Sequence, residues 1–221
     1  MNYSFTDRTG GLSTGAFLSR NLATHVGDDQ ATVIANRAEL ENLLGLPIQY
    51  MNQIHGDAVA TVGAEIIPEP TADALVTQSV DIGLAVMVAD CIPLLMASSK
   101  TVAAVHVGRK GLMNKVAVAT VQEMRSRDTS QITAVVGPSI CGKCYEVSQD
   151  IYDDVAKSFP LAESKTRDGA FALDLSRALI DQLESIGVKV INEGGCTVED
   201  INLYSYRRDG VTGRQAGVVW L

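Results

Sequence analysis

The chain has 221 residues, of which 46% are hydrophobic and 20% are charged, and this balance is typical of one sizeable globular domain spanning 1–221. Its formal net charge of −8, with no basic run, argues against a nucleic-acid backbone as the main partner. The most apolar segment, Leu84–Ala97, is too short to span a membrane. Because the first nine residues hold no apolar signal-peptide core and all four cysteines suit a reducing compartment, we expect a cytoplasmic protein.

The first 28 residues are rich in turn-forming residues and predict loop with a short strand. Glycines give this segment a permissive backbone, and among them lie three polar side chains, Arg8, Asn21 and His25. Loops of this kind often carry functional groups, so Arg8 and Asn21 are candidates for substrate contacts. A surface loop without any role is an equally acceptable interpretation.

A helix is predicted over Gln30–Leu44, where Asp28 or Asp29 is the expected N-cap and Gly45 with Pro47 ends it. Its apolar side is expected to consist of Val33, Ile34, Ala38, Leu40, Leu43 and Leu44.

The middle of the chain predicts a series of short strands. A strand is expected at Ala58–Val62, and Asp73 lies in a turn before another short apolar segment. Three further apolar runs read as buried strands, Leu84–Ala89, Pro93–Ala97 and Thr101–Val105.

The second half mixes helices and strands without a regular alternation, and it contains no GxGxxG or phosphate-binding loop. An α+β or layered α/β fold is therefore favoured over a Rossmann fold. The expected elements are helices at Leu112–Arg125, Ser148–Phe159 and Asp174–Ile186, strands at Ile132–Val136 and Val188–Ile191, and an apolar strand at the C-terminus.

The three histidines all lie one or two residues before a glycine. Two histidines and one cysteine make a three-ligand zinc set that leaves one position open, and His55, Cys91 and His106 fit this description. Their separations along the chain are too long to support the assignment, so the fold must assemble the set. Alternatively, Cys91 is a nucleophile, His106 its base, and Asp90 or another carboxylate the group that orients the base.

Two other features carry weaker signals. Cys141 and Cys144 form a C-x-x-C pair, but only Cys196 remains to complete a second pair, so we interpret the motif as incidental. Near the C-terminus, Arg208 and Arg214 lie among glycines and are candidate partners for an anion.

Several motifs together resemble the laccase-domain family, also called multicopper polyphenol oxidase or peptidoglycan editing factor. The segments that carry the resemblance run from end to end of the chain in order: TDRTGGLSTGAFLSRNLATHVGDD (6–29), QIHG (53–56), DALVT (73–77), ADCIP (89–93), HVGRKG (106–111), GPSICGKCYEV (137–147) and SYRRDGVTGR (205–214).

The resemblance implies a zinc site at His55, Cys91 and His106 within a layered α-β-β-α sandwich of mixed sheets. The implied activities are purine nucleoside phosphorolysis, adenosine deamination and methylthioadenosine cleavage, so the implied partners are a purine nucleoside and phosphate, with the chain a monomer or homodimer. Copper is the other metal that the family name suggests, but the sequence holds no Met-His copper ladder.

Two rival hypotheses remain. The editing-factor name implies a Cys91–His106 amidase acting on UDP-MurNAc precursors of peptidoglycan. The second rival hypothesis is a polyphenol oxidase or a metal-binding protein without catalysis. One motif is relevant to this second hypothesis. Where the family usually reads H-A-G-W-R-G, this chain has His106-Val-Gly-Arg109-Lys110-Gly. If the missing tryptophan packs on a substrate ring, ring selectivity differs here, whereas if it packs structurally, little changes.

Overall fold

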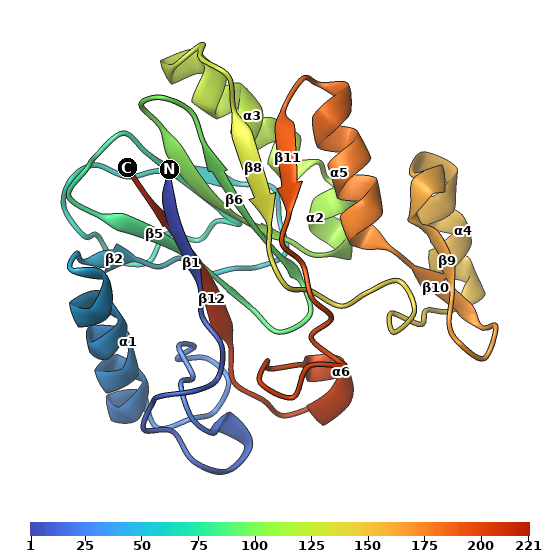
Figure 1. The fold of residues 1–221 in the computed structure, drawn as a ribbon, viewed down its shortest axis with the longest axis horizontal. Coiled ribbons are helices and arrows are strands. Elements are labelled where there is room, and N and C mark those ends of the chain that lie inside the picture. Colours follow the sequence, from blue (N-terminus) through green and yellow to red (C-terminus); the bar gives the residue numbers. More distant parts are fainter.

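The computed structural model describes residues 1–221 as two packed sheets covered on both outer faces by helices (Figure 1). This is the expected α-β-β-α sandwich with mixed sheets. None of its helices combines the length and apolarity needed to cross a membrane.

The smaller sheet has four strands in the order β1-β12-β5-β2, so the two ends of the chain pair with each other. β1 and β12 are antiparallel, and β5 joins β12 antiparallel and β2 parallel. The bounds are β1 Asn2–Phe5, β2 Ile48–Gln49, β5 Gly83–Val88 and β12 Gln215–Trp220.

The larger sheet has six strands in the order β11-β8-β6-β7-β4-β3, and a separate hairpin pairs β9 with β10. The centre, β8-β6-β7-β4, is antiparallel, and the edge strands β11 and β3 are parallel to their neighbours. The bounds are β3 Val59–Thr61, β4 Ala74–Thr77, β6 Ile92–Ala97, β7 Val102–Val107, β8 Thr133–Val136, β9 Glu163–Lys165, β10 Phe171–Leu173 and β11 Lys189–Asn192.

The central strands are buried on both faces, which explains why their sequences are continuous apolar runs without polar alternation. In β6, Leu94 and Met96 face the helices, whereas Leu95 faces the other sheet. In β5, Val86 lies between the sheets and Met87 faces α1. Each strand therefore contributes to two core layers through its two-residue period.

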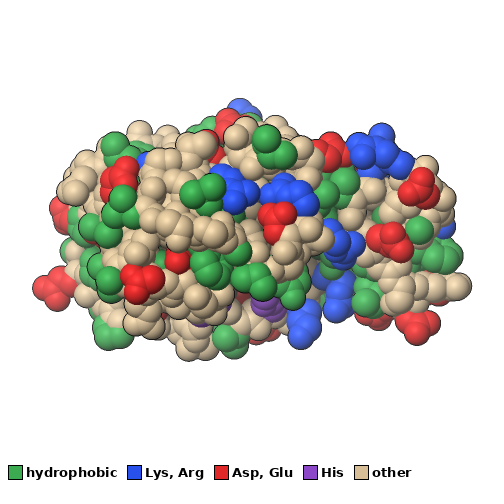
Figure 2. Space-filling view, turned by 90° about the horizontal axis from the view of Figure 1, so that it is seen from below, with side chains coloured by type: hydrophobic (Ala, Val, Ile, Leu, Met, Phe, Trp, Pro, Cys, Tyr) green, Lys and Arg blue, Asp and Glu red, His purple; other side chains and the backbone are tan.

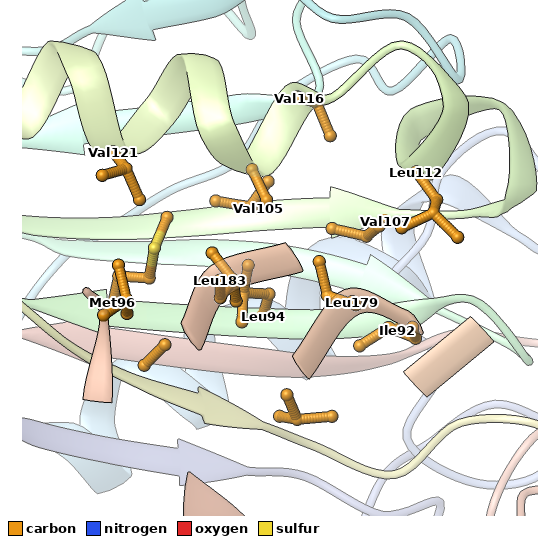
Figure 3. Close-up of a cluster of buried hydrophobic side chains, with 14 of the residues drawn as sticks. Ile92, Leu94, Met96, Val105, Val107, Leu112, Val116, Val121, Leu179 and Leu183 are labelled. Carbon is orange, nitrogen blue, oxygen red and sulfur yellow. The ribbon is translucent and has the colours of Figure 1, made fainter. Parts of the chain in front are cut away.

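Helices α2, α3 and α5 pack on the outer face of the larger sheet, as Figure 3 shows for α3 above Val105 and Val107 of β7. Leu179 and Leu183 of α5 enter the same layer beside Leu94. The bounds of the helices on this side and in the loops are α2 Arg109–Met113, α3 Val116–Arg127, α4 Gln149–Ser158, α5 Leu175–Ser185 and α6 Tyr206–Asp209.

On the smaller sheet the covering helix is α1, Gln30–Leu44, with the bounds that the sequence predicted. The Asp29 carboxylate accepts the Thr32 amide as N-cap, and Gly45 adopts φ 75° at the C-cap. The expected apolar side is wrong in part. Ile34 and Leu43 are 61% and 63% exposed, and Asn36 takes a buried position instead.

Asn36 is buried because the N-terminal loop folds over α1 and needs polar partners there. Its amide oxygen accepts the Leu12 N–H at 2.8 Å, and its amide nitrogen donates to Ser13 Oγ and to the Asn21 carbonyl at 2.9 Å. A buried side chain with these partners satisfies its hydrogen-bonding groups, so the helix faces the sheet with a narrower apolar stripe than its sequence suggests.

Two other sequence predictions need correction. The helix expected at Leu112–Arg125 is two helices, α2 and α3, because Lys115 adopts φ 62° between them. The strand expected to end at Val105 continues as β7 to Val107, so His106 lies within the strand. The remaining predicted helices and strands agree with the structure to within two residues.

Two leucines on α1 provide a direct test of this packing. Leu40 is 3% exposed and Leu43 is 63% exposed on the same helix. We expect Leu40→Ala to lower the free energy of unfolding by about 2–5 kcal/mol, because it removes buried methyl groups and leaves a cavity. Leu43→Ala should change it by less than about 0.5 kcal/mol. Denaturant unfolding of both variants measures the difference, and equal losses would contradict the orientation of α1.

Candidate functional site

A cavity of about 360 Å³ opens where β5 of the smaller sheet passes into β6 of the larger one. This volume falls in the range of small-molecule sites, about 300–1,000 Å³. All three histidines line it, and Figure 2 shows histidine atoms recessed in this face with Lys and Arg side chains to one side. The lining residues are His25, Gln53, His55, Met87, Val88, Ala89, Asp90, Cys91, His106, Ile140, Tyr145, Tyr206, Arg207 and Arg214.

Asp73 is the buried acid that organises the two histidines at the floor of the cavity. Its side chain is fully buried directly before β4. One carboxylate oxygen accepts the His55 amide at 2.9 Å and contacts His106 Nδ1 at 2.8 Å. The other accepts the amides of Gly56 at 2.6 Å and Ile54 at 3.3 Å. Burial raises the pKa of Asp73, but the His106 ring and the amides of Gly56 and Ile54 outweigh burial. The pKa of Asp73 therefore lies below its ordinary value.

The contacts in this region explain the residue types of the QIHG segment (53–56). Gln53 bonds the main chain of Met87 in both directions at 2.8 Å, which extends the edge of the smaller sheet. His55 adopts φ 60°, a left-handed conformation uncommon outside glycine. Gly56 is the close-approach position, since a Cβ there would lie 3.3 Å from the Asp73 carboxylate. Ile54, His55 and Gly56 of the motif therefore surround Asp73, and Gln53 ties the segment to β5.

His106 is held twice by Asp73, because its backbone amide also donates to the Asp73 carbonyl at 2.8 Å. Its side chain is 4% exposed and its Nδ1 faces the carboxylate, so the other ring nitrogen is left for the cavity. The rings of His55 and His106 meet edge to face, with centroids 4.6 Å apart.

Cys91 and Asp90 form the turn between the two sheets. Asp90 adopts φ 97°, and its carboxylate accepts Thr197 Oγ1 and the Arg207 amide, each at 2.6 Å. It therefore fixes the turn to the C-terminal segments, and it does not contact His106. Cys91 Sγ lies 3.8 Å from His55 Nε2. Gly108 completes the packing, since a Cβ there would meet Cys91 Sγ at 3.0 Å.

These three side chains fit a metal ion. The ligand atoms of His55, Cys91 and His106 all lie within 4.8 Å of one another. Asp73 holds His55 through its backbone amide and His106 through its ring Nδ1, and a carboxylate bonded to the distal nitrogen of a ligating histidine, as at His106, is the usual second shell of such a site. Two imidazoles and one thiolate are a donor set that zinc accepts with a fourth position open.

The same geometry pairs charges across the cavity floor. Burial raises the pKa of Cys91, but the facing His106 ring, followed by His55, outweighs it and lowers the value to about 6. Burial lowers the pKa of His106, but Cys91 and Asp73 outweigh it and raise the value to about 9. Cys91 is thus stabilised as a thiolate, the form needed either as metal ligand or as nucleophile.

Arg214 lies in the cavity wall, as does its neighbour His25. Its Nη1 donates to the carbonyls of Thr212 and Gly213 at 2.8 and 2.9 Å, and its Nε and Nη2 have no partner in the protein. Burial lowers the pKa of the Arg214 guanidinium, with opposing effects from Cys91 and Asp90. A half-buried cation with free donors is suited to an anion.

The other candidate polar residues are committed elsewhere and do not line the cavity. Arg208 donates to the carbonyls of Thr197 and Leu203 at 2.8 and 2.7 Å and pairs with Asp209. Arg8 Nε donates to the Leu18 carbonyl, and its guanidinium stacks on Tyr204. Asn21 is buried, bonding Ala23, Asp28 and the Arg214 amide. Asn21 thus braces the backbone that carries Arg214, and Arg208 ties α6 to the segment from Thr197 to Leu203.

The sequence reasoning missed several members of the site. The sequence pattern places Asp73 in a turn and assigns it no role, although an acid directly before a buried strand is a signal for a paired carboxylate. Tyr145 and Tyr206 also line the cavity. Arg109 stands at the position of the family's tryptophan, and its charge acts on Tyr145, whose pKa burial raises.

The sequence is similar to bacterial proteins along nearly its whole length. It is 40% identical over 228 residues to a protein of Corynebacterium glutamicum named purine nucleoside phosphorylase, covering 98% of this chain and 93% of that one. It is 42% identical over 230 residues to a Streptomyces coelicolor protein of the same name, covering 100% and 95%.

Solved structures agree with the fold. A crystal structure of a Neisseria meningitidis protein superposes with a TM-score of 0.90 at 38% identity, covering 99% of this chain and 93% of that one. The YlmD protein of Geobacillus stearothermophilus gives 0.89 at 30% identity, covering 98% and 90%. The family model described as multi-copper polyphenol oxidoreductase laccase matches residues 2–221. The chain therefore belongs to this family, as its motifs indicated.

Proposed function

We propose that the protein is a zinc-dependent phosphorylase of purine nucleosides, which also deaminates adenosine and cleaves methylthioadenosine. The observation that carries the proposal is the set His55, Cys91 and His106 gathered around buried Asp73 at the floor of a nucleoside-sized cavity. The relatives named purine nucleoside phosphorylase support the substrate class. When bound, zinc supplies a Lewis acid at the cavity floor.

The residues around the cavity floor have separate roles in phosphorolysis. Arg214 directs its free Nε and Nη2 donors at the phosphate, whose negative charge the half-buried guanidinium balances. The aromatic rings of Tyr145 and Tyr206 line the cavity and supply a surface for the purine. Phosphate must attack C1′ as the bond to the purine nitrogen breaks, so holding both partners in one cavity lowers the entropic cost.

Arg207 keeps the purine wall in place. Its Nη1 donates to the Glu146 carbonyl at 2.9 Å, and its guanidinium lies 5.2 Å from the centre of the Tyr145 ring. Its backbone amide is bound by Asp90. Arg207 therefore couples the segment that carries Tyr145 to the turn that carries Cys91.

Product analysis tests the proposed reaction. Zinc-loaded protein incubated with inosine or adenosine and phosphate should release the free base and ribose 1-phosphate, both resolved by chromatography. His106→Ala should lower the rate at least about 100-fold, because it removes a zinc ligand and leaves Asp73 without its imidazole partner. Release of base without phosphate consumption, or full activity in folded His106→Ala protein, would contradict the proposal.

The two arginines of the C-terminal segment provide a matched comparison. Arg214→Gln removes a charge-assisted contact worth about 1.5–3 kcal/mol, so the KM for phosphate should rise by about 10- to 150-fold. Arg208→Lys should lower the free energy of unfolding through lost carbonyl contacts and leave the KM for phosphate within about twofold. Initial rates at varied phosphate measure both. A larger effect from Arg208→Lys would place the phosphate elsewhere.

A second candidate function is favoured by one observation. Cys91, His106 and Asp73 also satisfy the chain of contacts that a cysteine hydrolase needs, with a thiol of lowered pKa, a facing imidazole and a carboxylate 2.8 Å behind it. The amidase that edits UDP-MurNAc precursors is the corresponding hypothesis. His55 Nε2 at 3.8 Å from Cys91 Sγ has no place in that mechanism but completes a metal site.

The two functions differ in the covalent state of Cys91. An amidase would accumulate an acyl adduct on Cys91 when zinc-free protein is mixed with the peptidoglycan precursor, and intact-mass spectrometry detects it. We expect no adduct, and we expect nucleoside turnover to vanish on zinc removal and return on its addition. A trapped adduct together with full turnover in zinc-free protein would favour the amidase.

A further inference from the structure

A second group of metal-binding side chains lies outside the cavity. Cys141 and Cys144 follow β8, and Cys196 and Glu199 follow β11, its parallel neighbour. The sulfur and carboxylate atoms of these four residues all lie within 4.8 Å of one another. The sequence interpretation of Cys141 and Cys144 as incidental therefore missed their partners, because Glu199 supplies the fourth group in place of a cysteine.

The two halves of the group share one backbone design. The Cys141 carbonyl accepts the amides of Cys144 and Tyr145, both at 3.0 Å. The Cys196 carbonyl likewise accepts the amides of Glu199 at 3.1 Å and Asp200 at 2.9 Å. Each half is thus a tight turn that presents two ligand side chains three residues apart. Paired turns with this C-x-x-ligand spacing are how proteins build tetrahedral zinc sites from thiolates.

The main chain also fixes the two turns against each other. The Ser139 amide donates to the Gly195 carbonyl at 3.0 Å, and the Thr197 amide donates to the Ser139 carbonyl at 3.1 Å. The strand-like bridge between Ser139 and Cys196 continues the parallel pairing of β8 with β11. The four side chains are therefore brought together by the folded backbone.

From this geometry we propose that Cys141, Cys144, Cys196 and Glu199 bind a second zinc ion, in a closed structural site. Zn–S bonds of about 2.3 Å separate tetrahedral ligands by about 3.8 Å, so the atoms need to move by about 1 Å or less. Three soft thiolates select zinc over magnesium or calcium. With four protein ligands no position is left for substrate, which distinguishes this site from the cavity floor.

The charges around the group suit a bound dication. Three thiolates and a carboxylate outweigh one zinc ion, and the Arg167 guanidinium pairs with Glu199 at the surface. Arg167 is 67% exposed, so its side chain can shift when Glu199 turns toward the ion. Cys144 Sγ already contacts the Glu199 carboxylate at 3.6 Å.

This site would brace the cavity wall. The Cys144 and Glu146 carbonyls accept Arg207 Nη1 at 3.4 and 2.9 Å, and Tyr145 between them lines the cavity. Thr197, next to Cys196, donates to Asp90 at 2.6 Å. A zinc ion joining the two turns would therefore hold both supports of the Cys91 turn, without taking part in the reaction.

Metal analysis of variants tests the second site independently of the proposed function. Full-length protein purified under reducing conditions in zinc-supplemented medium should carry about two zinc ions per chain by mass spectrometry of the metal. Cys196→Ser should carry about one and keep the cavity zinc, and His106→Ala should also carry about one. Lys143→Ala, in the same turn but without a ligand, should carry two. Complete loss of zinc in folded His106→Ala, or two ions retained in Cys196→Ser, would overturn the second site.

Zinc-edge X-ray absorption on the wild-type chain gives a readout that does not depend on any variant folding. Two occupied sites should average about two sulfur ligands per zinc, whereas the cavity site alone has one sulfur and two histidine nitrogens. An average of one sulfur per zinc at saturating metal, or a Cys141–Cys144 disulfide in the intact mass of the reduced-purified protein, would contradict the proposal.

Discussion

The buried carboxylate of Asp73 is the constraint on which the candidate site depends. A fully buried acid is costly unless its charge is compensated, and here the compensation comes from three loop amides and the His106 ring. Those partners belong to, or lie beside, His55 and His106, two of the proposed zinc ligands. Satisfying one carboxylate therefore orients His55 through its backbone and His106 through its side chain.

The layered fold explains why this carboxylate lies where it does. β5 belongs to one sheet and β6 to the other, so the Ala89–Cys91 turn must cross between layers at one end of the sandwich. β4 begins and β7 ends at the same place, and there Asp73 and His106 meet. The C-terminal segment reaches this end through the Asp90 contacts. Residues more than a hundred positions apart thereby line one cavity.

Local patterns in the sequence predicted much of the fold, and their limits have physical causes. Apolar runs predicted β5, β6 and β7 because strands buried on both faces carry no polar alternation. Helical periodicity predicted α1, but it was wrong about Ile34 and Leu43, which are exposed, and about Asn36, which is buried where the N-terminal loop bonds to it. The candidate ligands His55, Cys91 and His106 were predicted from their residue types and from the motif resemblance, because no spacing rule places them together. The sequence did not predict the roles of Asp73 and of the partners of Cys141, because these roles arise only from contacts between distant strands.

The zinc affinity of an Asp73→Asn variant tests the role of this carboxylate most directly. It is measured through the protection of Cys91 from alkylation as zinc is added to metal-free protein. Asparagine keeps the size of the side chain but loses its charge and one acceptor. We predict that half-protection requires about 10- to 100-fold more zinc than in the wild type, the usual effect of removing a second-shell carboxylate. Asp57→Asn, outside the site, should leave it unchanged. Equal protection in folded Asp73→Asn and wild-type protein would contradict the central role of this carboxylate.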